Sequence, residues 1–311
     1  MGACFDAIWG GYRTGRRNFL FDSRYRCNED FEMRIEKIIN NNIISAKDYQ
    51  GVELVVMGKG IGFGQRPGNE VDDRAVEKIF RLENMDNTEY FKELLASLPL
   101  EHIRLSSDII TYAKDSLGLT LNQNVYLTLT DHINFTLKKY REGLVFNNAL
   151  YDEVKLFYPL EYSVGRYALE LIEERTGCRL HDDEAASIAL HLINGETNSA
   201  MGTTFFMVKM MREMMELIEE QISIPDVSTY PKERLISELK QLSNRLVTEE
   251  PMCGRKDDQL YKFVKEHYQK EYRIINRVSE YIEKEYNCNM TEEEKIYLVL
   301  NIKRMRDLYT C

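Results

Sequence analysis

Residues 33–80 read MRIEKIINNNIISAKDYQGVELVVMGKGIGFGQRPGNEVDDRAVEKIF, and this stretch decides the first part of the fold. Short β-branched and apolar runs within it are separated by Asn40-Asn41-Asn42 and by Asp48-Tyr49-Gln50-Gly51. Such runs and breaks are typical of strands and turns. Six of the seventeen glycines fall between positions 51 and 68, which indicates positive φ or close backbone approach. The stretch predicts a compact β module in a chain that otherwise reads as helix.

The charge of this module differs from that of the whole chain. Residues 33–66 carry five basic and three acidic side chains, within a chain of net charge −10. The basic residues are Arg34, Lys37, Lys47, Lys59 and Arg66. An acidic protein repels phosphate over most of its surface, so contact with nucleic acid must be confined to a patch. We therefore expect a nucleic-acid-binding surface on the β module.

Composition limits the number of domains, the location of the protein and the use of its cysteines. The chain has 311 residues, of which 43% are hydrophobic and 30% charged, so two or three domains with real cores are expected. No apolar run approaches the roughly 20 residues that cross a bilayer, so we expect a cytoplasmic protein without membrane insertion. The six cysteines are scattered without C-x-x-C or metal-type spacing. Reduced thiols, and neither a metal nor a cofactor, are expected.

Residues 1–32 are interpreted as an N-terminal extension of unknown role. Met33 begins the first well-patterned segment, which suggests the hypothesis that translation naturally starts there. N-terminal sequencing of the native protein tests this, and a mature end near Met1 would refute it.

From about residue 90 onward, apolar residues recur at helical spacing, as in Val125, Leu129, Ile133 and Leu137. The helical part also contains an internal repeat, because residues 167–191 match residues 277–301 at an offset of 110. Cys178 then meets Cys288, and Glu184 meets Glu294. Two copies with this long period predict two homologous helical bundles, separated by the small and polar residues 195–202.

The chain has five histidines, and two of them lie at the edge of apolar helical stripes. These are His132 in LTDHI and His191 in IALHL. A hydrogen-bonded side chain at the edge of the core is the simplest reading of either one. Phosphoryl acceptance is the functional alternative, because neutral imidazole is a nucleophile near physiological pH. No neighbouring Cys or acid completes a metal-ligand set. His102, His181 and His267 are expected on the solvated surface.

Four stretches of the sequence resemble the BglG/LicT family of bacterial transcriptional antiterminators. INNN at 39–42 and ELVVMGKGIGF at 53–63 are similar to its co-antiterminator RNA-binding domain. LTDHINF at 129–135 and EAASIALHLIN at 184–194 are similar to its first PTS regulation domain. The likeness extends from Met33 essentially to the C-terminus.

The resemblance implies a multidomain α+β protein, in which a small all-β RNA-binding domain precedes two homologous all-α helical-bundle domains. We place the domains at 33–88, 92–198 and 203–311. The family likeness further implies a homodimer that binds an imperfect RNA hairpin in the leader of a sugar-utilisation operon. Binding prevents a terminator hairpin from forming, so the protein is a regulator and not an enzyme.

Carried over position by position, the resemblance implies RNA contacts from Asn42, Gly58, Lys59 and Phe63, with Lys37 as a further candidate. Amides that read base edges, cations that meet phosphate and aromatics that stack on exposed bases are the usual tools of RNA recognition. The competing readings are a turn for Asn42, a solvated charge for Lys59 and a dimer core for Phe63. Where relatives carry Arg at the position of Lys59, this chain lacks a planar bidentate donor.

The resemblance also implies that His132 and His191 accept phosphate from the sugar-specific enzyme II of the phosphotransferase system, which inhibits the protein. Glu238 and Asn301 occupy the matching places of the second regulation domain, where relatives often have histidines that HPr phosphorylates. HPr is therefore a less secure partner for this chain. We hypothesise that Glu238 supplies a permanent negative charge; the alternative is that the second domain is an unregulated dimerisation module.

Two rival functions are weaker. A nucleotide-using enzyme is suggested by GKGIGFG at 58–64, but the spacing fits neither a Walker loop nor G-x-G-x-x-G. A DNA-binding regulator with the same regulation domains lacks a helix-turn-helix signal before them, and the strand-rich block is too short and β-like for that motif.

Overall fold

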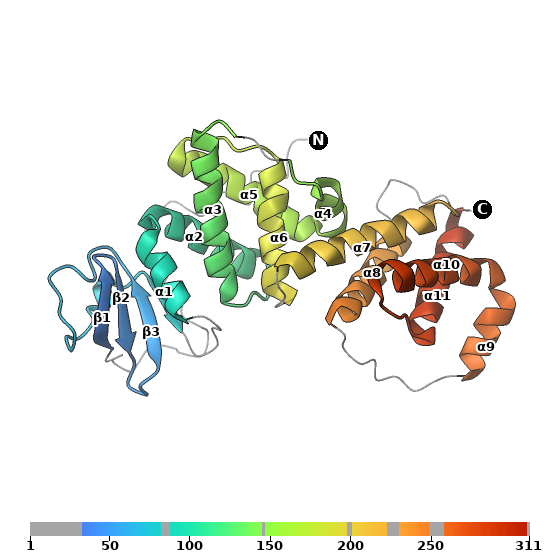
Figure 1. The fold of residues 1–311 in the computed structure, drawn as a ribbon, viewed down its shortest axis with the longest axis horizontal. Coiled ribbons are helices and arrows are strands. Elements are labelled where there is room, and N and C mark those ends of the chain that lie inside the picture. The colour runs from blue at the N-terminus through green and yellow to red at the C-terminus, as the bar shows by residue number, and fades with distance from the viewer. Residues whose placement is uncertain are drawn as a thin grey trace, which may run out of the picture. The chain divides into compact units, whose positions relative to one another are not determined.

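The computed structural model describes residues 33–81, 88–144, 147–197, 201–222, 230–248 and 258–309 (Figure 1). The chain divides into two compact units, Met1–Ser97 and Leu98–Cys311. The proposed extension 1–32 and four of the six cysteines lie outside the described residues; Cys178 and Cys288 are free thiols.

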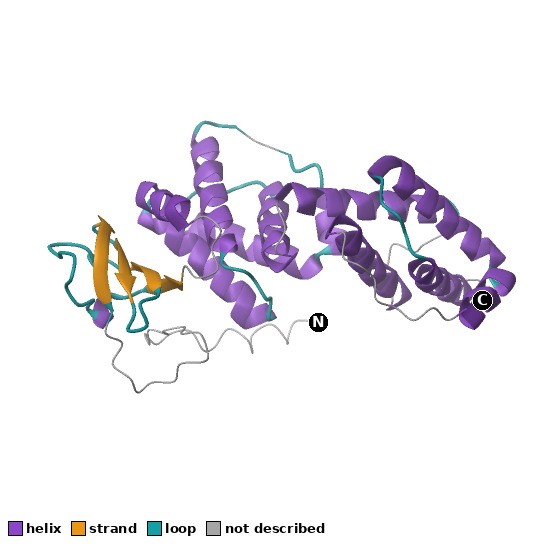
Figure 2. Ribbon diagram, turned by 60° about the horizontal axis from the view of Figure 1, so that its bottom comes forward, coloured by secondary structure: helices purple, strands orange, loops and turns teal. Residues whose placement is uncertain are grey.

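The first unit contains a four-stranded antiparallel sheet in the order β1-β2-β3-β4, drawn in orange in Figure 2. Its strands are β1 (Arg34–Asn40), β2 (Ile43–Lys47), β3 (Glu53–Met57) and β4 (Lys78–Arg81). The first three lie where the sequence predicts strands. β4 was not predicted, because its apolar part is only the pair Ile79-Phe80 between charged residues.

Both faces of this sheet are covered within the first unit. One face carries a core of buried residues that includes Ile35, Ile44, Leu54 and Val56. Helix α1 (Thr88–Ser97) contributes Phe91, which is fully buried and packs edge-on against Phe80 with ring centroids 5.3 Å apart.

The second unit contains two helical bundles. The first comprises α2 (Leu100–Leu117), α3 (Asn124–Arg141), α4 (Tyr151–Phe157), α5 (Pro159–Thr176) and α6 (Asp183–Thr197). The second comprises α7 (Met201–Glu219), α8 (Tyr230–Thr248), α9 (Asp258–His267), α10 (Gln269–Tyr286) and α11 (Glu292–Tyr309). None of the described helices is long and apolar enough to cross a membrane.

The predicted repeat is confirmed down to the helix ends. Helices α5 and α10 begin and end 110 residues apart. Each is followed by a residue in the left-handed region, Gly177 with φ 68° and Asn287 with φ 54°. Glycine and asparagine are the residues that most readily adopt this conformation, which closes the last helical turn. The expected class, a small β domain before two homologous helical bundles, is therefore correct.

Candidate nucleic-acid interface and phosphoacceptor pocket

The turn between β1 and β2 is tied to the glycine-rich loop that follows β3. The backbone N–H of Gly58 donates to the carbonyl of Asn42, and that of Gly62 donates to the carbonyl of Asn41, at 2.9 and 3.1 Å. The N–H of Gly60 donates to Asn42 Oδ1 at 2.9 Å. These bonds hold two segments that are distant in sequence as one surface.

Three predicted RNA contacts lie on this turn–loop surface. Asn42 uses its Oδ1 to hold the loop, which leaves its two Nδ2–H donors without a partner among the described residues. Lys59 is exposed; its backbone N–H donates to Glu77 Oε1 at 3.2 Å, and its ammonium has no partner among the described residues. The Phe63 side chain is 73% exposed. An amide donor, an ammonium and an open aromatic ring are thus presented together, a combination suited to RNA.

The other two candidates have different surroundings. Gly58 is buried, and a Cβ built on it would lie 1.7 Å from the carbonyl oxygen of Ala75. Glycine is therefore required at this position for packing, whether or not RNA approaches it. Lys37 is exposed on β1, and none of the described contacts joins it to the turn–loop surface.

His132 and His191 meet in the first bundle, where α3 packs on α6. Their ring centroids are 4.7 Å apart, with an angle of 39° between the planes. His132 Nε2 lies 3.1 Å from Glu184 Oε2, the separation of an ion pair, although the angle falls outside that of a hydrogen bond. Thr136, one turn after His132, donates to the same carboxylate oxygen at 3.4 Å. The two predicted phosphoacceptors therefore share one site with an acid.

Burial controls the charge of the second ring. The pKa of His191 is held well below its usual value, first by burial and then by repulsion from His132. Its Nδ1 is buried and has no hydrogen-bond partner within the part of the chain that the structure describes. His191 is consequently a neutral imidazole at physiological pH, the form in which a ring nitrogen is nucleophilic.

A cavity of about 430 Å³ opens beside His132. Its lining includes the cationic or titratable side chains Lys139, Arg179 and His181, together with Glu184 and Ser187. Arg179 has no partner among the described residues. The cavity thus offers an anionic phosphoryl group cations next to the histidine, whereas the Ser187 hydroxyl donates to the carbonyl of Asp183 at 3.3 Å.

The second bundle carries a matching cavity of about 320 Å³, lined by Glu238, Arg245 and Glu294 among others. Arg245 donates to both oxygens of Glu294, at 2.7 and 2.8 Å. Glu238 approaches only Arg234, at 3.9 Å among the described ion pairs. Asn301, at the place of His191, donates from Nδ2 to the carbonyl of Tyr297 at 3.0 Å. The described residues of this cavity include no histidine.

Sequence reasoning missed the role of Glu184 and the clamp on Glu294. The repeat did align these two acids, but it could not show which side chain each one faces. One expectation was wrong: His102 is buried on α2, where Nδ1 lies 3.0 Å from Asn134 Oδ1 and burial lowers its pKa. His181 and His267 are exposed, as expected.

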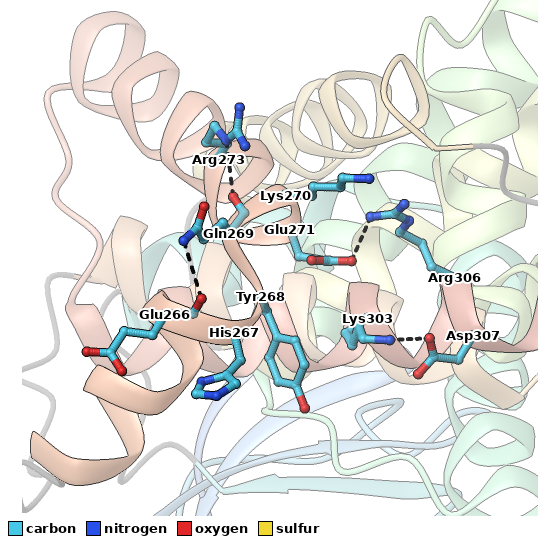
Figure 3. A pocket seen from close by; sticks show the side chains of 10 residues that line it. All are labelled: Glu266, His267, Tyr268, Gln269, Lys270, Glu271, Arg273, Lys303, Arg306 and Asp307. Carbon is cyan, nitrogen blue, oxygen red and sulfur yellow. Dashed lines mark hydrogen bonds and ion pairs between the residues drawn. The ribbon is translucent and has the colours of Figure 1, made fainter.

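Another cavity of about 390 Å³ lies where α9 meets α10, near the end of α11 (Figure 3). Arg306 donates to Glu271 at 2.7 Å, and Lys303 pairs with Asp307. Since these cations are neutralised by carboxylates of the same cavity, we assign no binding function to it.

Comparisons with known proteins agree with this architecture. The family model described as CAT RNA binding domain matches residues 33–89, and the PRD domain model matches residues 107–195 and 208–305. Transcription antiterminator LicT of Bacillus subtilis (strain 168) is 39% identical over 274 residues, which are 88% of this chain and 99% of that protein. The beta-glucoside operon antiterminator of Dickeya chrysanthemi is 35% identical over 88% of this chain and 97% of that protein. The crystal structure of GlcT CAT-PRDI is 31% identical, with a TM-score of 0.49, and covers 54% of this chain and 99% of that one.

Proposed function

This chain belongs to the BglG/LicT family of transcription antiterminators, and on that premise we propose that it binds an RNA hairpin in the leader of a sugar-utilisation operon. Binding stabilises the antiterminator hairpin and so prevents the terminator from forming. The family consists of regulators, so the protein acts by binding and not by turnover.

The turn–loop surface is the observation that carries this proposal. Asn42, Lys59 and Phe63 present an amide, a cation and an open ring. Two backbone hydrogen bonds and a third accepted by the Asn42 side chain fix the two segments that bear them. RNA loops and bulges expose unstacked bases and phosphates that suit these groups. Lys37 is a further contact, and Gly58 acts by allowing the loop to pack.

Control belongs to the first regulation domain. Phosphorylation of His132 and His191 by the sugar-specific enzyme II adds negative charge where α3 meets α6 and inhibits RNA binding. The second domain keeps Glu238 as a permanent negative charge, with HPr as a second, weaker candidate partner. The protein works as a cytoplasmic homodimer with domains at 33–88, 92–198 and 203–311.

The test is RNA binding by the full chain. Fluorescence anisotropy with the leader hairpin across a salt series should give RNA-selective binding, and a DNA hairpin of the same sequence should bind much more weakly. Lys59→Ala should lower affinity and reduce the salt slope by about one. Lys47→Ala is the matched control, because Lys47 in the same sheet pairs with Glu36 at 2.5 Å.

Equal binding of RNA and DNA would favour the DNA-binding alternative. Binding by Lys59→Ala with unchanged affinity and salt slope would remove the turn–loop surface from the interface.

A further inference from the structure

The contact between His132 and Glu184 concerns one particular ring nitrogen. Nε2 of His132 is buried, and it faces Glu184 Oε2 at 3.1 Å. Thr136 donates to the same oxygen from the same helix. The two atoms fall outside hydrogen-bond geometry, but a carboxylate at this distance attracts a proton on Nε2 and so favours the tautomer that carries it there. It also repels a phosphoryl dianion that approaches from this side.

We propose that Glu184 is a positioning residue for phosphoryl acceptance, and that Nδ1 of His132 is the acceptor atom. This inference rests on the proposed function, because it takes His132 to be phosphorylated, and it adds which atom reacts and which side chain prepares it.

Phosphoryl transfer from the donor protein to His132 needs no further reactant. The Nδ1 lone pair attacks the phosphorus of a phosphorylated donor protein, and an N–P bond forms. The bond from phosphorus to the donor's nitrogen or sulfur breaks, and the donor keeps that electron pair. The proton on Nε2 stays in place, so the product ring is a cation. Glu184 stabilises this cation at the moment when it develops.

The cavity beside His132 suits the transferred group. The cations Lys139 and Arg179 line it. Lys139 pairs with Glu142 at 3.5 Å, with both groups partly exposed, and its Nζ lies 5.4 Å from the ring centroid of Phe135. Exposed contacts of this kind are weak, so Lys139 can turn towards a dianion at little cost. Glu184 and these two cations line one cavity with His132, so the acid can hold the ring while the cations receive the phosphoryl group.

The second bundle shows the same acid without this role. Glu294 accepts hydrogen bonds from Arg245 and from both the backbone N–H and the hydroxyl of Thr291, at 2.7 to 2.9 Å. Its oxygens are thus fully used by a helix cap and an arginine. Glu294→Gln is consequently a matched control. It makes the same change at the same repeat position, in a cavity whose described lining contains no histidine.

The experiment uses the full chain labelled with ¹⁵N-histidine and phosphoramidate as the phosphoryl donor at alkaline pH. Peptide mapping locates the phosphate, and long-range ¹H–¹⁵N spectra identify the substituted nitrogen. We expect Nδ1 substitution at His132. Glu184→Gln should slow phosphorylation there by at least about tenfold and should yield a mixture of Nδ1 and Nε2 products, because the amide no longer fixes the proton.

Nε2 substitution in the unaltered protein would overturn this inference and leave the proposed function intact. This readout needs no variant, so it holds even where Glu184→Gln fails to fold. A Glu184→Gln protein that reacts at the same rate and on Nδ1 alone would also overturn it. Absence of phosphate from His132, with phosphoramidate and with a complete phosphotransferase mixture, would overturn both.

Discussion

The two regulation domains place the same helices around an acid at the same repeat position, yet they use that acid differently. In the first, Glu184 faces His132, and Lys139 is turned to Glu142. In the second, Glu294 is clamped by Arg245, which stands seven residues after Glu238 just as Lys139 stands seven after His132. Because the second acid is already neutralised inside its own domain, only the first pocket keeps an acid free to act on a histidine.

The largest effect should come from removing the phosphoacceptors. His132→Ala combined with His191→Ala should abolish phosphorylation of the chain, because the matching positions in the second domain carry no imidazole. Acid-labile phosphate measured after incubation with a complete phosphotransferase mixture tests this. Glu238→Ala is the control and should leave the incorporated phosphate unchanged. Substantial phosphate on the double variant would show that a side chain outside the first pocket accepts it.

The next effect concerns stability. Arg245→Met leaves the Glu294 carboxylate, whose side chain is 9% exposed, without its cation and should lower the free energy of unfolding by about 3 kcal/mol. Lys139→Met removes a partly exposed ion pair with Glu142 and the cation over the Phe135 ring, and should cost less than about 1 kcal/mol. Urea denaturation of the two variants measures both values, and similar costs would mean that the two pockets are electrostatically alike.

A smaller effect is expected in cells for Glu238→Gln. Our hypothesis is that Glu238 acts as a permanent substitute for phosphate. Loss of its charge should then reduce antitermination several-fold in a reporter strain. Gln241→Glu, which adds a carboxylate to the same cavity, is the opposite change. Unchanged reporter activity for Glu238→Gln would refute the hypothesis and favour a second domain that serves only dimerisation.

The smallest effect should be a pH dependence confined to the first domain. Burial and the neighbouring Glu161 raise the pKa of Glu196 to about 7. The matching pair in the second domain is Glu271 with Arg306, an ordinary ion pair at 2.7 Å. The cation near Glu196 is Lys240 on α8 of the second bundle, whose Nζ lies 4.0 Å from the ring centroid of Tyr158.

The direction in which folding stability changes with pH follows from proton binding by Glu196. Between the ordinary carboxyl pKa and about 7, folded Glu196 holds a proton that the unfolded chain has lost. Stability is therefore full at low pH and falls as pH rises through 7. Glu196→Gln should flatten this dependence in urea unfolding measured from pH 5 to 8, and Glu174→Gln, an exposed position on α5, should not. A slope that survives Glu196→Gln would place its origin elsewhere.

Local sequence signals predicted elements well and tertiary partners poorly. The repeat gave two homologous bundles because helical periodicity and cap residues recur at a fixed offset. Pairing across helices was not accessible: His132 and Glu184 are 52 positions apart, and periodicity assigns a face but not a partner. The same limit explains His102, for which a solvated surface is the default expectation from sequence, whereas α2 turns it toward Asn134.

The most direct test of the account is hairpin binding by the full chain before and after phosphorylation by enzyme II, in parallel with the His132→Ala, His191→Ala double variant. We predict that phosphorylation weakens RNA binding of the unaltered protein at least about tenfold and leaves the double variant unaffected. Equal RNA affinity before and after verified phosphorylation of His132 and His191 would contradict control through the first regulation domain.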